Sequence, residues 1–252
     1  MILMYHHVCP SEAIPVEQTD LEGWRYTITP AAFEKQLLLF RSKRLQFVSL
    51  SDYLLAMSLG NPAFSRMVTV TFDDGWRDNF IYAVPVLQRQ GIPATFFVVS
   101  GEMRGVAPDR RMTCEQLRSL QTAGMTIGAH TRTHPNLTTL NTNELVSEIH
   151  GCKADLEAVL GNSVDFLAYP GGRFNKDVVA ACQEAGFLAA CSVINWGQNS
   201  EASRFWLYRE VFSDHMDRLS NLVRLNPVAR RILARRAGSR VRHMLAAPTS
   251  ER

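Results

Sequence analysis

Long apolar runs are absent from this sequence, and no stretch reaches the roughly 20 apolar residues that a membrane-spanning helix needs. The chain begins MILMYHHV, which lacks the basic segment and the long apolar run of a secretory signal. We therefore expect a protein of the cytoplasm.

Cysteine is scarce, and its pattern argues against two classes of protein. The five cysteines are an odd number, and no two of them form a C-x-x-C pair. Neither a disulfide framework nor a cysteine-rich zinc site is expected from this pattern. A reducing compartment fits it best. The sequence also contains no internal repeat and no low-complexity linker.

Acidic residues are missing from the C-terminal part of the chain. From Arg218 to Ser250 there are eight arginines and no Asp or Glu, although the formal net charge of the whole chain is only +3. A net charge this small does not indicate a nucleic-acid partner. Leucines and isoleucines recur among the arginines at helical spacing, which predicts a basic helical tail over residues 216–252, broken near Pro227. Its apolar stripe could pack on the rest of the protein, or it could lie on anionic lipid at the inner membrane face.

The rest of the chain alternates between short apolar strands and amphipathic helices. The predicted strands are Ile2–Tyr5, Met67–Phe72, Ala94–Val99, Thr126–Ala129, Phe166–Tyr169 and Ala189–Ile194. The predicted helices are Ala31–Ser42, Asp78–Gln90, Thr113–Ala123, Asn143–Leu160 and Asn175–Ala185. This succession predicts an α/β fold with a parallel sheet. If the sheet closes into a barrel, functional residues should lie at the C-terminal ends of the strands.

Two adjacent carboxylates, Asp73 and Asp74, follow the predicted strand Met67–Phe72 in the sequence TFDDG. Gly75 permits a sharp turn, so both side chains could reach one cleft. Like charges this close raise the pKa of one group unless a cation intervenes. A divalent metal would resolve the conflict, because one Asp could bind it while the other stays free as a base. The simpler alternative is an Asp-Gly turn with solvated carboxylates.

Two histidines, His130 and His134, follow another predicted strand in the sequence GAHTRTHPN. Histidines four residues apart converge readily on a metal, although Pro135 and the threonines indicate a loop rather than a helix. Two surface or capping histidines are the alternative. Together with one of the two aspartates they form a three-ligand set with a position left for water, which a catalytic metal site needs.

Two further clusters also follow predicted strands. Gly171 and its neighbours in the sequence AYPGGR could bring free backbone N–H groups close to an oxyanion, although a plain strand-to-helix turn is the alternative. His6 and His7 follow the first strand and are candidates for a general acid beside a metal site. A hydrogen-bonded, partly buried histidine pair is the alternative there.

In this order, the fragments TFDDG, HTRTHPNL and AYPGG resemble the signatures of the polysaccharide deacetylases, carbohydrate esterase family four. The resemblance spans roughly residues 1–212. It implies a distorted (β/α) barrel, which we assign to residues 1–215. It also implies that Asp74, His130 and His134 hold one divalent metal ion, with zinc as the expected ion, and that Asp73 is the catalytic base.

The chain departs from the family pattern at two positions. Many members carry an arginine, paired with the base, where this chain has Ala168. Many also carry a late Leu-x-His motif, whose histidine is the general acid. At that place this chain has Leu207-Tyr208-Arg209. Both gaps are similar to the exopolysaccharide (poly-N-acetylglucosamine) deacetylase branch, whose opening Tyr-His motif matches Tyr5-His6. The resemblance therefore implies His6 as the general acid and Arg209 as the partner of Asp73.

The implied activity is removal of the N-acetyl group from a sugar in a polysaccharide, oligosaccharide or lipid-linked glycan. Candidate substrate-binding residues are Tyr169, Pro170, Gly171 and Trp196. Tryptophans such as Trp76, Trp196 and Trp206 suit stacking on sugar rings, but tryptophan is also ordinary core or rim material. Two alternatives remain: an amidase or deformylase with the same fold and a non-sugar substrate, and a non-catalytic glycan-binding relative that has kept the metal site. The intact Asp73 argues against the non-catalytic relative, because a protein that only binds glycans does not need a catalytic base.

Overall fold

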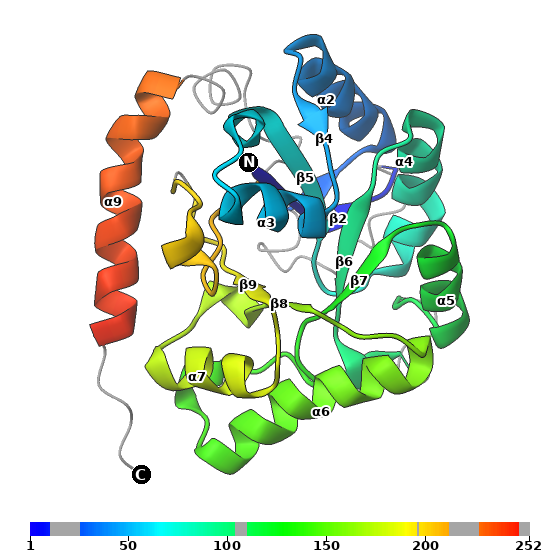
Figure 1. Cartoon of the computed structure of the whole chain (residues 1–252). Coiled ribbons are helices and arrows are strands. Elements are labelled where there is room, and N and C mark those ends of the chain that lie inside the picture. Colours follow the sequence, from blue (N-terminus) through cyan, green and yellow to red (C-terminus); the bar gives the residue numbers. More distant parts are fainter. Residues whose placement is uncertain (11–25, 104–109, 196, 212–226, 247–252) are drawn as a thin grey trace.

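A parallel-stranded barrel surrounded by helices forms the body of the molecule (Figure 1). The computed structural model describes residues 1–10, 26–103, 110–195, 197–211 and 227–246. Within these ranges, the strands follow the spatial order β10-β1-β5-β6-β7-β8-β9. Their bounds are β1 Ile2–Tyr5, β5 Met67–Phe72, β6 Ala94–Val98, β7 Thr126–Ala129, β8 Phe166–Ala168, β9 Ala189–Cys191 and β10 Arg209–Val211. The short strand β4 (Gln46–Phe47) pairs with β5, and β2 (His7–Val8) pairs with β3 (Thr27–Ile28).

The chain after β9 brings the two ends of the sheet together. Strand β10 pairs with β1 in parallel. Just before β10, Leu207 forms a parallel bridge with Cys191 at the end of β9. The backbone N–H of Arg209 then donates to the carbonyl of Ile194. The barrel is therefore nearly closed, which confirms the fold that the resemblance to the family implied.

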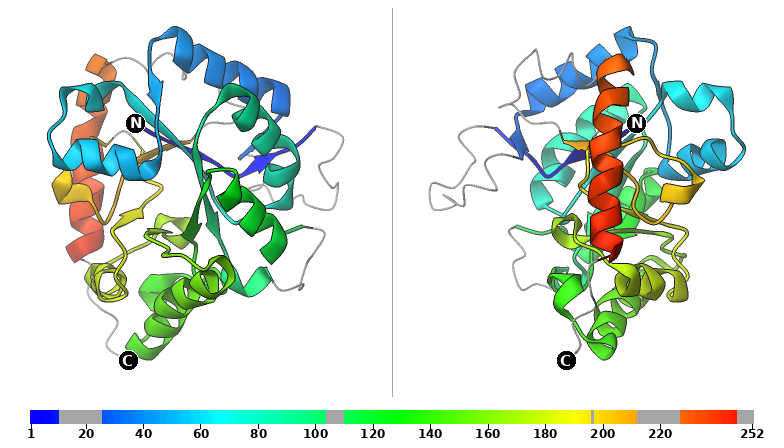
Figure 2. Two further views of the ribbon diagram at one scale, coloured as in Figure 1. Left: turned by 45° about the vertical axis from the view of Figure 1, so that its right-hand side comes forward. Right: turned by 90° about the vertical axis from the view of Figure 1, so that its left-hand side faces the viewer.

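Helices cover the outside of the barrel in both views of Figure 2. Their bounds are α2 Pro30–Ser42, α3 Leu50–Ser58, α4 Val84–Gln90, α5 Cys114–Thr122, α6 Thr142–Leu160, α7 Lys176–Glu184 and α9 Pro227–Ala246, with a π-helical turn at Asn79–Ala83 before α4. Thr29 caps the N-terminus of α2, and a reciprocal capping box between Thr113 and Gln116 opens α5. Helix α3 and strands β2, β3, β4 and β10 were not predicted.

Alternation along the strands separates an inner from an outer core. Inward-facing apolar residues, among them Ile2, Phe97 and Phe166, form one cluster with the buried side of α3. Gly128 on β7 leaves room for Phe97, because a Cβ at Gly128 would lie 2.5 Å from that ring. The outer core lies between the strands and the surrounding helices.

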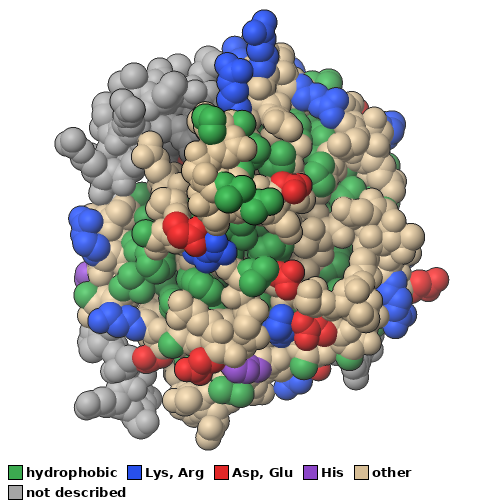
Figure 3. All heavy atoms as spheres, viewed as in Figure 1, with side chains coloured by type: hydrophobic (Ala, Val, Ile, Leu, Met, Phe, Trp, Pro, Cys, Tyr) green, Lys and Arg blue, Asp and Glu red, His purple; other side chains and the backbone are tan. Residues whose placement is uncertain are grey.

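Helix α3 covers the end of the barrel at which β1 begins. The N-terminal amino group of Met1 lies 3.2 Å from Tyr53 Oη on α3. Figure 3, seen from this side, shows apolar side chains gathered in the middle of the face. Two of the exposed apolar residues are Leu55, which lies on α3, and Leu59, which directly follows it. The opposite end of the strands therefore remains for a functional site.

Helix α9 supplies the described part of the basic tail. Ala237 and Val241 are buried and belong to the main core, so this part of the helix packs along the barrel (Figure 2). Residues 216–226 lie outside the described residues, and so does the first of the two predicted tail helices. Among the described helices, none is long and apolar enough to cross a bilayer. Contact of the tail with a membrane surface stays a prediction.

Candidate active site

A pocket of about 530 Å³ lies at the C-terminal ends of the strands. The residues that line it follow different strands: His6 comes after β1, Asp73 and Asp74 after β5, His130 after β7, and Gly171 after β8. His134 lines the same pocket. The structure thus brings together candidate residues from four separate sequence motifs, because parallel strands end at the same rim of a barrel.

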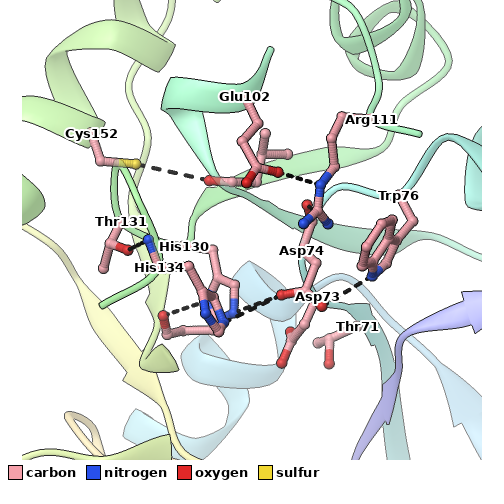
Figure 4. Close-up of polar contacts among 12 residues, drawn as sticks. Thr71, Asp73, Asp74, Trp76, Glu102, Arg111, His130, Thr131, His134 and Cys152 are labelled. Atoms are coloured by element: carbon pink, nitrogen blue, oxygen red, sulfur yellow. Dashed lines mark hydrogen bonds and ion pairs between the residues drawn. The ribbon is translucent and has the colours of Figure 1, made fainter. Parts of the chain in front are cut away.

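The three proposed metal ligands converge on one point. One ligand atom from each of Asp74, His130 and His134 lies within 4.8 Å of the other two. Asp74 Oδ1 lies 3.3 Å from Nε2 of His130 and 3.5 Å from Nε2 of His134. Figure 4 shows both rings directed at this carboxylate.

A second contact orients the ring of His130 for ligation. Its Nδ1 lies 2.7 Å from the carbonyl oxygen of Ala168. A carbonyl oxygen only accepts hydrogen bonds, so Nδ1 carries a proton and Nε2 is the ring nitrogen left to bind a metal ion. Metal-binding histidines are generally held in this way. The donor set therefore fits a divalent metal ion such as zinc.

The loop between the two histidines has the bent shape that their convergence requires. Thr131 and His134 both have positive φ angles, of 66° and 60°. Glu148 on α6 holds the loop, because its carboxylate accepts from the backbone N–H groups of Arg132 and Thr133, both at 2.9 Å. His134 then reaches the pocket although no helix places it one turn from His130.

Asp73 forms a buried, bidentate ion pair with Arg209. Both distances between guanidinium nitrogens and carboxylate oxygens are 2.6 Å. Arg209 also donates to Thr71 Oγ1 and to the carbonyl of Ser192, so its orientation is fixed. Burial alone would raise the pKa of Asp73, but the guanidinium outweighs burial and holds this pKa below its usual value. Many family members carry an arginine at the inward-facing position that Ala168 occupies in this chain. Here the arginine that pairs with Asp73 lies on β10 instead.

The two N-terminal histidines lie in different surroundings. His6 is partly buried, lines the pocket, and lies 4.7 Å from the ring of Tyr26, measured between centroids. Within the described part of the chain, its Nδ1 has no hydrogen-bond partner. Burial lowers the pKa of His6, although the carboxylates of Asp73 and Asp74 oppose this effect. His7 instead faces Asp78, with Nδ1 2.5 Å from Oδ2.

The predicted substrate-binding residues divide into three groups. Pro170 and Gly171 line the pocket. The side chain of Tyr169 does not: it is fully buried in the outer core, and its hydroxyl donates to the carbonyl of Phe205 at 2.8 Å. Strand alternation explains this difference, because Ala168 faces into the barrel and its neighbour Tyr169 must face outward. A substrate contact by the Tyr169 side chain does not fit this position, and Trp196 lies outside the described residues.

Sequence reasoning missed a group of residues around Asp74. The indole Nε1 of Trp76 donates to Asp74 Oδ2 at 3.0 Å, and Arg111 donates to the backbone carbonyl of Asp74 at 2.9 Å. Trp76 could have been suspected because it follows Gly75 directly. Arg111 and the loop-holding Glu148 lie in segments without any motif, so nothing in the sequence indicated them.

The chain is similar to known proteins in sequence and in fold. A family model described as polysaccharide deacetylase matches residues 60–190. YxkH of Bacillus subtilis (strain 168) is 25% identical over 208 residues, which are 82% of this chain and 69% of YxkH. The poly-beta-1,6-N-acetyl-D-glucosamine N-deacetylase of Staphylococcus aureus (strain MRSA252) is 24% identical over 202 residues, 75% of this chain and 69% of that protein. The Streptococcus pyogenes deacetylase PplD, solved in complex with acetate, is 25% identical with a TM-score of 0.79, covering 90% of this chain and 97% of PplD.

Proposed function

Because this chain belongs to the polysaccharide deacetylase family, we propose that it is a metal-dependent hydrolase that removes the N-acetyl group from an N-acetylated sugar. The observation that carries the proposal is that one pocket contains both a three-ligand set and a separate buried carboxylate, Asp73. The substrate we propose is an N-acetylglucosamine unit of a polysaccharide, an oligosaccharide or a lipid-linked glycan. The relative from S. aureus supports this choice by its name, and PplD supports it by the acetate in its structure.

The metal would be held by Asp74, His130 and His134. When bound, a divalent ion supplies Lewis-acid polarisation of the acetyl carbonyl and of the attacking water. We propose zinc, because two imidazoles and one carboxylate with an open position are a typical catalytic zinc set.

Asp73 and His6 would carry the two proton transfers of the hydrolysis. Ionised Asp73 accepts a proton from the water whose oxygen attacks the acetyl carbon. Arg209 keeps this carboxylate ionised and fixed. In this proposal the backbone N–H of Gly171, which lines the pocket, donates to the oxyanion that then forms. The C–N bond breaks as His6 donates a proton to the sugar nitrogen, which gives acetate and an amino sugar. His6 must be protonated for this step; burial lowers its pKa, and the carboxylates of Asp73 and Asp74 oppose that effect.

Acetate release tests the proposed function directly. The zinc-loaded protein is incubated with N-acetylglucosamine oligosaccharides, with lipid-linked N-acetyl sugars and with simple non-sugar N-acetyl and N-formyl amides. We expect acetate and free amino sugar from a glycan, and we expect a chelator to abolish the release. Release from the non-sugar amides alone would instead support an amidase or deformylase. A protein that binds the glycans without turnover would be a binding relative, and the proposed function would be wrong.

Replacing His6 by alanine tests the proposed acid. We expect kcat to fall by about 10²–10⁴-fold, because the leaving nitrogen then lacks its proton donor. Elemental analysis should still find the metal, since His6 is not among the ligands. The matched variant His7→Ala should have a smaller effect on kcat in the presence of saturating zinc. If His6→Ala is as active as the wild type while His215→Ala is not, the acid comes from residue 215, which lies outside the described residues.

A further inference from the structure

The two oxygens of the Asp74 carboxylate have different partners. Oδ1 faces Nε2 of His130 and of His134, whereas Oδ2 accepts a hydrogen bond from the indole N–H of Trp76 at 3.0 Å (Figure 4). The backbone of Asp74 is held as well, because Arg111 donates to its carbonyl at 2.9 Å. Asp74 is therefore held both at its carboxylate and at its backbone carbonyl.

The indole of Trp76 itself packs against two other side chains. The ring centroid of His7 lies 4.1 Å from that of Trp76, and the guanidinium carbon of Arg111 lies 3.4 Å from it. His7 is in turn held by Asp78, and Arg111 forms an ion pair with Glu102. Trp76 also lines the pocket and is partly exposed, so the sugar-stacking role expected from the sequence stays a prediction.

We infer that Trp76 is a positioning residue, whose N–H turns the Asp74 carboxylate so that Oδ1 alone faces the metal position between the histidines. A carboxylate can bind a cation through one oxygen or both, and it rotates freely unless its second oxygen is held. Hydrogen-bond partners of metal ligands typically contribute about 10–100-fold to metal affinity. The inference rests on the proposed function only through the ligand set Asp74, His130 and His134.

The test is the zinc affinity of Trp76→Phe, measured by competition with a chromophoric chelator in the absence of substrate. Phenylalanine keeps an aromatic ring beside His7 and Arg111 but has no N–H. We expect the zinc Kd to rise by about 10–100-fold, while the melting temperature of the metal-free protein stays close to that of the wild type. Trp206→Phe is the matched control, because Trp206 packs near Phe174 and does not line the pocket. Its zinc Kd should equal that of the wild type.

An unchanged zinc Kd in Trp76→Phe would overturn the inference, as would an equal rise in Trp206→Phe. If Trp76→Phe does not fold, 3-benzothienylalanine at position 76 keeps the bicyclic shape and replaces only the N–H by sulfur. An unchanged Kd in that protein would overturn the inference equally. The proposed function has a separate test: it is wrong if the zinc-loaded wild type releases no acetate from any N-acetylated glycan.

Discussion

Asp73→Asn is expected to lower kcat by about 10²–10⁴-fold, because an amide oxygen cannot take the proton from water that a carboxylate takes. Asparagine has nearly the same shape as aspartate, so the pocket and the ligand set should keep their geometry. Acetate release at saturating zinc measures the loss. Elemental analysis of the same sample should find one metal ion per chain, since Asp74 and the histidines are unchanged.

The same substitution should also destabilise the fold. Asp73 and Arg209 are both fully buried, so the neutral amide leaves the guanidinium without its counter-charge. Removing one partner of a buried ion pair costs about 3–5 kcal/mol. We therefore expect the free energy of unfolding of Asp73→Asn, measured in urea, to fall by an amount in this range.

A double variant separates these two effects. Asp73→Asn combined with Arg209→Met removes the stranded charge, so it should regain part of the unfolding free energy that Asp73→Asn loses. It should not regain activity, because the proton acceptor is still missing. Near-normal turnover by Asp73→Asn would refute the base assignment. Recovery of turnover in the double variant would mean that Asp73 only neutralises Arg209.

The strands that carry the site could be predicted because they are apolar and end in polar motifs. Strands β1, β5 and β7 match the predicted ranges residue for residue. Strand β10 was missed because it begins with Arg209 and Glu210, which are buried although charged residues rarely occupy a strand interior. The two-residue strands β2, β3 and β4 are too short for any periodicity to be seen.

Site residues that follow a strand could be predicted from the local sequence, whereas pairings between distant residues could not. Asp74 and His130 follow strand ends, so their position at the rim follows from the topology. The pairing of Asp73 with Arg209 joins residues 136 positions apart, and only the resemblance to a family suggested it. Tyr169 was expected to bind substrate because it belongs to the AYPGG motif. The motif alone does not take account of strand alternation, which directs this side chain into the outer core.

Removal of a single metal ligand should abolish stoichiometric zinc binding. Asp74→Asn, His130→Ala and His134→Ala each delete one of three donors, and we expect the zinc Kd to rise by more than the about 100-fold that an outer hydrogen-bond partner contributes at most. Asp74→Asn is the sharpest of these variants, because it keeps the side-chain shape and an oxygen for the bond from Trp76 while it removes the charge. Elemental analysis after gel filtration measures the metal content, and acetate release should be lost together with it.

Thermal stability gives a second readout of the same ligand set. A ligand at 100 times its Kd stabilises the folded state by about 2.7 kcal/mol, so zinc should raise the melting temperature of the wild type. Each of the three ligand variants should lose this rise. His243→Ala is the matched control, because His243 is exposed on α9 and should keep both the metal and the rise. Of the ligand variants, His134→Ala perturbs the metal-free fold least, since its side chain is 43% exposed whereas that of His130 is 2% exposed. If His134→Ala still binds one equivalent of zinc with the affinity of the wild type, His134 is not a ligand and the three-donor site is wrong.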